Sequence, residues 1–241
     1  SNVTDRKFAE FLRQSNILAH PQLSRLRICD CLIGYHSVKS IADSVDLTLE
    51  QHSPVSMDFS GCILSKSAVQ LLAELIQNGF PLQGLILNQN PVHNDGAMVL
   101  GNSLRNKLCQ LQTLQLVNCS IKSSGGNSIM SSLETNQSLT LLNLSDNILN
   151  DDHSHQFGSL CGAVLSSNST LTSLNLSHTL LYTITDDFKE GLTRNQSLTH
   201  ISFANNRLGP AGLRQVLQVL SENNIISSMY LSGTRLTEEV V

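Results

Sequence analysis

The stretch LTLLNLSDNIL at residues 139–149 decides the fold of this chain. It follows an apolar frame of eleven positions, L-x-x-L-x-L-x-x-N/C/T-x-L. Copies of the frame begin 27 to 32 residues apart, and the other seven start at Leu23, Pro54, Leu82, Leu111, Leu171, Leu198 and Ile226. A repeat of this period is typical of a solenoid, in which each unit buries its apolar face against its neighbours.

Each position of the frame has a physical role. Positions 1, 4 and 6, here Leu139, Leu142 and Leu144, alternate along a short strand and are expected to point into the core, while positions 3, 5 and 7 point away from it. Position 9 is expected to donate hydrogen bonds to backbone carbonyls left open where the chain leaves the strand. Its occupants are Cys31, Cys62, Asn90, Cys119, Asn147, Thr179, Asn206 and Thr234.

Helical periodicity follows the strand segments. In the seventh copy, Leu213, Val216, Leu217 and Leu220 recur with helical spacing, and Pro210 stands where a helix can begin without losing a hydrogen bond. The chain is therefore expected to have an α/β fold: a leucine-rich-repeat solenoid, shaped as a horseshoe, with a parallel inner β-sheet and outer α-helices.

From the second copy onward, position 9 alternates between asparagine and either cysteine or threonine. With this alternation the sequence resembles the ribonuclease-inhibitor-like class of leucine-rich repeats, which also forms the sensor domains of NOD-like receptors. The resemblance covers about nine tenths of the chain. It implies a protein-binding role, although one repeat architecture serves many functions.

The two ends of the chain differ from the repeats between them. Residues 1–22 are expected to form an N-terminal capping helix, with Phe8, Phe11, Leu12 and Leu18 on one face. Residues 23–241 hold eight repeats, of which the last has a strand and no helix. An uncovered strand edge invites pairing, so we expect this end to be covered by further sequence or by a partner, and the chain to be part of a larger protein.

Composition limits the classes of partner. The net charge is −4 and only 14% of the residues are charged, so no broad basic field predicts nucleic-acid binding. No run of 18 or more apolar residues predicts a membrane span. The cysteine spacing follows the repeat and indicates free thiols, hence a cytoplasmic location. Seven N-x-S/T sequons argue for secretion, but most follow from the frame itself; they are at Asn2, Asn118, Asn136, Asn143, Asn168, Asn175 and Asn195.

The sequence contains no convincing catalytic or metal site. The densest polar run, from Asp151 to His155, could hold a divalent metal, but a solvated turn that caps the next helix is the simpler interpretation. We therefore expect no enzyme activity and no cofactor. One enzymatic alternative stays open: the GTPase-activating protein for Ran has the same repeat class, although its acidic segment has no counterpart here.

The inner wall, defined by frame positions 3, 5 and 7, is the expected binding surface. Eight strands about 4.8 Å apart, each exposing a length of about 16 Å, give a wall of about 540 Å². A standard interface needs about 800 Å² per partner, so the rim, meaning the loop residues that follow each strand, must contribute. Aromatic residues and arginine dominate binding hot spots. The candidate residues are Arg25, Arg27, Ile86, His178, His200, Arg207, Tyr230 and Arg235.

These arguments predict a non-catalytic protein-interaction module of an intracellular protein, acting in ligand sensing, autoinhibition or scaffolding. The partner is another protein, whose identity the sequence does not indicate. A pathogen effector that captures a host protein is the alternative from a different class, suggested by the Ser/Asn-rich, charge-poor composition.

Overall fold

The computed structural model describes residues 2–15, 23–44, 54–151 and 156–234, in which helices and strands alternate along the chain. The strands are β1 (Arg25–Arg27), β2 (Val55–Asp58), β3 (Leu82–Ile86), β4 (Thr113–Gln115), β5 (Leu141–Asn143), β6 (Ser173–Asn175), β7 (His200–Ser202) and β8 (Ser228–Tyr230). The helices are α1 (Asn2–Ser15), α2 (Tyr35–Asp43), α3 (Lys66–Gln77), α4 (His93–Leu104), α5 (Ser123–Ser132), α6 (Gln156–Ser167), α7 (Asp186–Arg194) and α8 (Gly209–Glu222).

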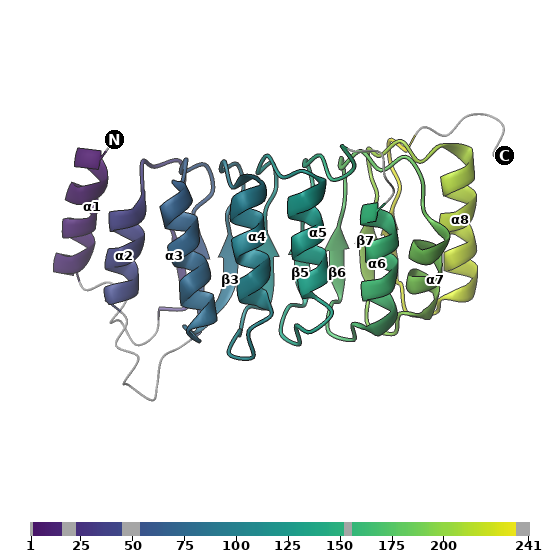
Figure 1. Cartoon of the computed structure of the whole chain (residues 1–241), viewed down its shortest axis with the longest axis horizontal. Coiled ribbons are helices and arrows are strands. Elements are labelled where there is room, and N and C mark those ends of the chain that lie inside the picture. Colours follow the sequence, from purple (N-terminus) through teal and green to yellow (C-terminus); the bar gives the residue numbers. More distant parts are fainter. Residues whose placement is uncertain (1, 16–22, 45–53, 152–155, 235–241) are drawn as a thin grey trace.

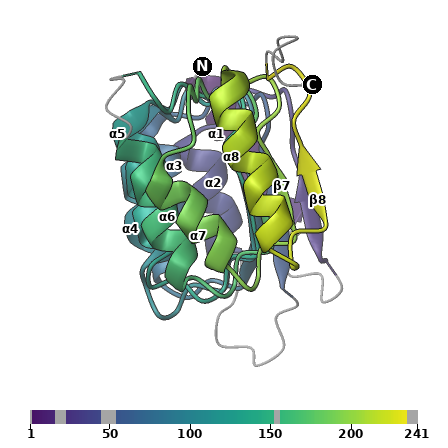
Figure 2. The same ribbon diagram turned by 90° about the vertical axis from the view of Figure 1, so that its right-hand side faces the viewer.

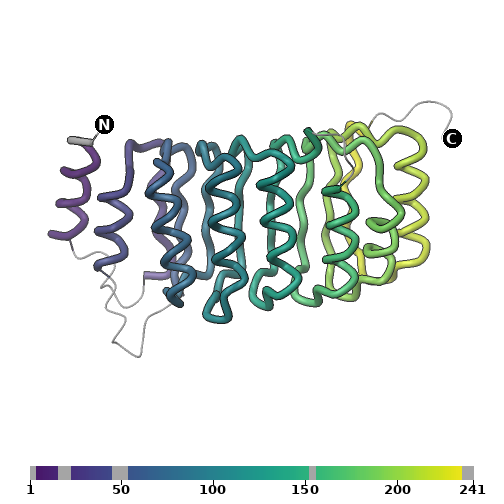
Figure 3. The backbone as a smooth tube through the Cα atoms, in the orientation of Figure 1, coloured from purple at the N-terminus to yellow at the C-terminus, as the bar shows by residue number. Residues whose placement is uncertain are grey.

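The strands form one open sheet in sequential order, and every neighbouring pair is parallel. The helices stand side by side along the long axis of the molecule (Figure 1). Seen from the end, they form one layer and the strands form the other (Figure 2). The backbone trace runs from helix to strand and back as one continuous coil (Figure 3). The predicted leucine-rich-repeat solenoid, with a parallel inner sheet and outer helices, is confirmed.

The core lies between the sheet and the helix layer, and the frame positions fill it as expected. Leu139, Leu142 and Leu144 are completely buried. Aromatic side chains add volume: Phe188 of α7 and Phe203 after β7 meet edge to face with ring centroids 5.7 Å apart. Because each repeat contributes the same positions, one apolar core runs through the described repeats.

The side chains at position 9 form hydrogen bonds between neighbouring repeats. The Asn147 side-chain nitrogen donates to the carbonyl oxygens of Leu144 and Leu116, at 2.9 and 2.7 Å, and its oxygen accepts from the amides of Cys119 and Ile121. The Cys119 thiol donates to the carbonyl of Leu87 at 3.1 Å, so the shorter side chain satisfies fewer backbone groups.

The first position-9 residue departs from the expected burial. Cys62 donates to the carbonyl of Ile28 in the preceding repeat, whereas Cys31 is exposed and its thiol binds the carbonyl of Cys29 in its own repeat. The reason is its place in the solenoid, because β1 is the first strand of the sheet among the described residues, and no described strand before it offers Cys31 a carbonyl from a preceding repeat.

Two helical faces also differ from expectation. Leu213 and Val216 of α8 are buried, but Val219 takes the place predicted for Leu217 and Leu220, which are exposed. In α1, Leu12 is buried and Phe11 is exposed, with Ala9 on the buried face instead. In both helices the buried face is therefore rotated from the face that the spacing of the large apolar residues predicted. Leu18 lies outside the described residues.

Helix α1 packs against α2 through a buried carboxylate. The Asp5 side chain accepts hydrogen bonds from the backbone amides of Gly34, His36 and Ser37, at 2.7, 3.0 and 3.1 Å. Asp5 therefore caps the N-terminus of α2 from a neighbouring helix. None of the described helices is both long and apolar enough to cross a bilayer.

Candidate functional site

On the inner wall, side chains at the same frame position of successive strands form rows that cross the sheet, because the strands pair in register. At position 5 the row places a cation and a carboxylate at one end, amides in the middle and an aromatic ring at the other end. Its members, in order, are Arg27, Asp58, Ile86, Gln115, Asn143, Asn175, Ser202 and Tyr230.

The charged side chains of the inner wall lie at its N-terminal end. Arg27 Nε lies 3.2 Å from Asp58 Oδ2 and 3.3 Å from Cys29 Sγ. Burial opposes ionisation of Asp58, but hydrogen bonds from Ser60, with help from the guanidinium of Arg27, hold its pKa below the ordinary value. Arg25 is exposed one wall position earlier on the same strand. This end therefore presents fixed charges of both signs.

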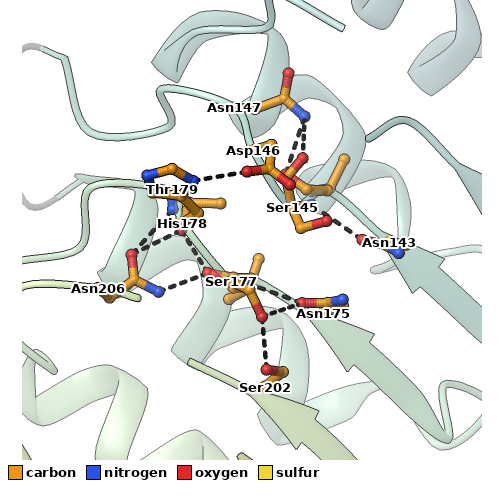
Figure 4. A network of polar contacts seen from close by, with 12 residues as sticks. Asn143, Ser145, Asp146, Asn147, Asn175, Ser177, His178, Thr179, Ser202 and Asn206 are labelled. Carbon is orange, nitrogen blue, oxygen red and sulfur yellow. Dashed lines mark hydrogen bonds and ion pairs between the residues drawn. The ribbon is translucent and has the colours of Figure 1, made fainter. Parts of the chain in front are cut away.

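The middle of the wall is neutral and its side chains are held in place. Asn143 and Asn175 accept hydrogen bonds from the backbone amides of Ser145 and Ser177 through their side-chain oxygens, at 3.0 and 2.9 Å. Ser177 also bonds the Ser202 hydroxyl, at 2.6 Å, so the network crosses two repeats (Figure 4). These contacts orient the two amides and leave their nitrogens without a partner among the described residues.

A shallow hollow of about 400 Å³ lies on the wall across β6, β7 and β8. His200 and Tyr230 both line it, together with Asn175, two aliphatic residues and several small residues. The Tyr230 ring is exposed, and the Nδ1 atom of His200 lies 2.8 Å from the Thr199 hydroxyl. Two of the predicted residues are thus brought together in one concave place.

The rim adds two ordered pairs above the wall. His178 Nδ1 lies 2.6 Å from Asp146 Oδ1, between adjacent repeats (Figure 4). The Arg207 guanidinium stacks over the ring of Tyr182, with 5.8 Å between its carbon and the ring centroid. Ile148 is exposed on the same rim.

The predicted residues therefore do not form a single patch. Arg25 and Arg27 mark the N-terminal end, His200 and Tyr230 share the C-terminal hollow, and His178 and Arg207 stand on the rim. Ile86 lies in the wall between the two ends and is half-buried. Arg235 lies outside the described residues.

Sequence reasoning overlooked the partners that fix these groups. Tyr182 supports Arg207 and Asp146 holds His178, yet neither was a candidate. Asp146 stands at position 8, between the wall residue Ser145 and the position-9 residue Asn147. Its place in the sequence gives no sign that it contacts the next repeat. Tyr182 follows the frame directly, and its aromatic ring was the one signal available.

A second asparagine ladder lies where the chain enters the strands, at the other end of the strands from the position-9 ladder. Sequence reasoning also missed it. Asn168 and Asn195 are buried, and their side-chain nitrogens donate to the carbonyls of Leu133 and Leu165, each at 2.8 Å. Their oxygens accept from backbone amides at the start of the following strand segment, and Asn136 and Asn223 repeat the pattern. The sequence pattern that could have predicted this ladder is an asparagine three residues before position 1 of the frame. Three of the seven sequons therefore consist of buried structural asparagines.

The polar run before α6 begins with a structural carboxylate. Asp151 accepts hydrogen bonds from the backbone amide and the hydroxyl of Ser123, at the N-terminus of α5. Burial opposes its ionisation, but the bonds from Ser123 hold its pKa below the ordinary value. Asp152, His153 and His155 lie outside the described residues. Within the described ranges, no group of three acidic, cysteine or histidine side chains is arranged to hold a metal ion.

Comparison with known proteins gives relatives of two kinds. No protein-family model matches the chain. It is 32% identical over 178 residues to the NACHT, LRR and PYD domains-containing protein 3 of Bos taurus, a match that covers 73% of this chain and 17% of that protein. It is 26% identical over 225 residues to the ribonuclease inhibitor of Sus scrofa, covering 92% of this chain and 48% of the inhibitor. The chain thus spans less than half the length of either relative.

Solved structures with a similar arrangement include the actin-binding site 2 of leiomodin-1, with a TM-score of 0.45 and 21% identity over 57% of this chain and 78% of that one. The tropomodulin C-terminal domain of Caenorhabditis elegans gives a TM-score of 0.40 and 14% identity, over 89% of this chain and 92% of that one. Both likenesses concern the fold alone.

Proposed function

Because the chain is a leucine-rich-repeat protein of the ribonuclease-inhibitor-like class, we propose that it is a non-catalytic module that binds another protein through its inner wall and rim. Its role is ligand sensing, autoinhibition or scaffolding within a cytoplasmic protein. The relatives support this at the level of the module, since one of them is named an inhibitor of ribonuclease.

The observation that carries the proposal is a surface of ordered but unsatisfied groups. The side-chain nitrogens of Asn143 and Asn175 are oriented by bonds to their oxygens and have no partner of their own in the described part of the chain. Arg207 is held by the Tyr182 ring and makes no ion pair with any described residue. Groups that are fixed before binding lose less conformational entropy when a partner arrives.

The cysteines and asparagines support the cytoplasmic location. All six thiols are free, which is typical of a reducing compartment. Asn136, Asn168 and Asn195 use their side-chain nitrogens to bond backbone carbonyls, so a glycan on any of them would break the second asparagine ladder.

The test is a pull-down from cytosolic extract with the wild-type chain and with an Arg27→Ala, Arg207→Ala, Tyr230→Ala triple variant. A matched control, Arg105→Ala, Arg194→Ala, Tyr35→Ala, removes the same residue types from the helix side. Circular dichroism first checks that both variants are folded, and mass spectrometry then identifies the bound proteins.

A protein that binds the wild type and the control but not the wall variant supports the proposal. The same proteins on all three chains, or loss only with the control, would contradict it. Loss of binding only with the control variant would place the binding surface on the helix side, where a hollow of about 760 Å³ opens against α5, α6 and α7.

A further inference from the structure

Two cysteines occupy position 9 in consecutive repeats, an arrangement found only at the start of this solenoid. Cys31 and Cys62 are 31 residues apart, the same offset that pairs Arg27 with Asp58 in the sheet. The backbone bond from the amide of Asp30 to the carbonyl of Ser60, at 2.9 Å, carries this register past the strands into the turns. The two cysteines are therefore direct neighbours across the repeat boundary.

Their separation suits a covalent link. Parallel segments in register lie about 4.8 Å apart, which falls inside the Cα–Cα range of about 4.4–6.8 Å that disulfides span. The Cys62 sulfur lies 3.0 Å from the carbonyl oxygen of Ile28, so it already points toward the first repeat. The backbone amide of Cys31 lies near enough to that sulfur to favour its thiolate. Both thiols are free in the structure.

We propose that Cys31 and Cys62 are a redox-sensitive pair that closes to a reversible disulfide when the protein meets hydrogen peroxide. The inference is independent of the proposed binding function. It assigns a modification site to the first two repeats, with a hydroperoxide as the co-reactant.

The chemistry balances in two steps. The Cys31 thiolate attacks the peroxide, forming an S–O bond and breaking the O–O bond, and hydroxide leaves. The Cys62 thiolate then attacks the Cys31 sulfur, forming the S–S bond and breaking the S–O bond, and a second hydroxide leaves. The two protons lost by the thiols convert both hydroxides to water. The sulfurs lose two electrons, which reduce one peroxide molecule.

Exposure selects Cys31 as the first thiol to react. Cys31 is exposed, whereas Cys62, Cys109, Cys119 and Cys161 are buried. Cys29 is half-buried and its sulfur contacts Arg27, so it is the competing thiol. Cys29, however, stands at position 7 and faces the inner wall, while Cys31 and Cys62 share position 9. Equivalent positions on parallel, in-register segments direct their Cβ atoms to the same side, so the Cys31 side chain must rotate away from the carbonyl of Cys29 to bring its sulfur to that of Cys62.

The position of the pair gives the modification a structural effect. Closing the disulfide would remove the bond from Cys62 to the carbonyl of Ile28 and tie the first repeat to the second. Each cysteine stands four residues after the last residue of its strand, and those last residues, Arg27 and Asp58, form an ion pair.

Trypsin makes the test simple, since cleavage after Arg27, Lys39 and Lys66 places Cys29 and Cys31 on one peptide (28–39) and Cys62 on the next (40–66). The folded protein is treated with hydrogen peroxide, remaining thiols are blocked with N-ethylmaleimide, and the digest is analysed without reductant. Peptides 28–39 and 40–66 should appear joined, with the summed mass lowered by two hydrogens, and dithiothreitol should separate them. Cys31→Ser should abolish the joined species, and Cys29→Ser should leave it.

A peptide 28–39 closed on itself, a joined species that survives Cys31→Ser, or cysteines that are only singly oxidised would each overturn the proposal. The pH dependence gives a second measurement. Burial raises the pKa of the Cys62 thiol to about 11. The closing step should therefore quicken about tenfold per pH unit from pH 7 to 9. A rate that does not change with pH would rule out Cys62 as the attacking thiol.

Discussion

Gly191 of α7 lies directly against Gly162 of α6, so closely that a Cβ atom added to Gly191 would overlap the carbonyl oxygen of Gly162. A Cβ on Gly162 would in turn meet the backbone of Asp187. The two helices can approach to this distance because neither carries a side chain at the contact. Neighbouring helices of the solenoid are therefore not interchangeable, although the frame that precedes each of them is the same.

Gly191→Ala should lower the free energy of unfolding by about 2 kcal/mol or more, because backbone atoms cannot move aside as a flexible side chain can. Gly158→Ala in α6 is the control. Its new Cβ would meet the Thr185 side chain at 3.2 Å, and alanine favours a helix over glycine. Urea denaturation measures both. Equal losses for the two variants would show that the glycine contact is not essential.

Asn147→Ala should cost about 3 kcal/mol of unfolding free energy, since it leaves several buried backbone groups without a partner. Asn143→Ala, four residues earlier on the inner wall, should cost less than about 1 kcal/mol because its amide nitrogen has no partner among the described residues. Chemical denaturation of the two variants measures the difference. If Asn143→Ala were the more damaging, the assignment of position 9 as the structural ladder would fail.

Asp5 should stabilise the docking of α1 at neutral pH and not in acid. Burial opposes ionisation of this carboxyl, but hydrogen bonds from the Ser37 hydroxyl and from the amides of Gly34, His36 and Ser37 outweigh it and lower the pKa. A lowered folded pKa contributes stability that is present above the unfolded value, about 3.9, and is lost as the pH falls through the folded value.

Thermal unfolding of the wild type and of Asp5→Asn tests this. The wild type should be the more stable at pH 7 by about 2 kcal/mol, as expected for a charged group with several buried hydrogen bonds. The difference should shrink below about pH 4. The comparison cancels the contributions of Asp58 and Asp151, whose carboxyls are unchanged in the variant. A difference that stayed constant down to pH 2 would contradict the role of the charge.

Alkaline pH should destabilise the fold through its buried thiols. Burial raises the pKa of Cys119 to about 12 and that of Cys62 to about 11, and it also raises the pKa of Cys161. The unfolded chain ionises its thiols from about pH 8.5, whereas the folded chain keeps them neutral. A raised folded pKa gives stability that is complete below the unfolded value and is lost as the pH rises through the folded value.

The stability advantage of the wild type over Cys119→Ser should therefore fall by up to about 1.4 kcal/mol per pH unit above pH 8.5, because serine does not ionise in this range. Urea denaturation between pH 7 and 10 measures the difference, and other titrating groups cancel in the comparison. An advantage that was independent of pH would mean that the Cys119 thiolate is accommodated in the folded state.

The candidate site was only partly accessible to sequence reasoning. Position numbers within the frame placed Arg27 and Tyr230 on the inner wall correctly, because the period of the strand sets which side chains face away from the core. The same numbers gave no sign that His200 and Tyr230 share a hollow, or that Tyr182 holds Arg207. Those contacts join different repeats, and their geometry depends on the turns between strands.

The sequence by itself determined the repeat, the parallel sheet, the buried leucines such as Leu142 and the ladder residue Asn147. Each of these roles is set within one repeat and then copied along the chain, so a local pattern is enough to specify it. Only the tertiary structure decided that Asp5 caps α2, that α6 and α7 meet at two glycines, that Leu217 is exposed and that Cys31 is exposed whereas Cys62 is buried. These relationships depend on how neighbouring repeats pack, and close packing is settled by the volume and direction of side chains from both repeats at once.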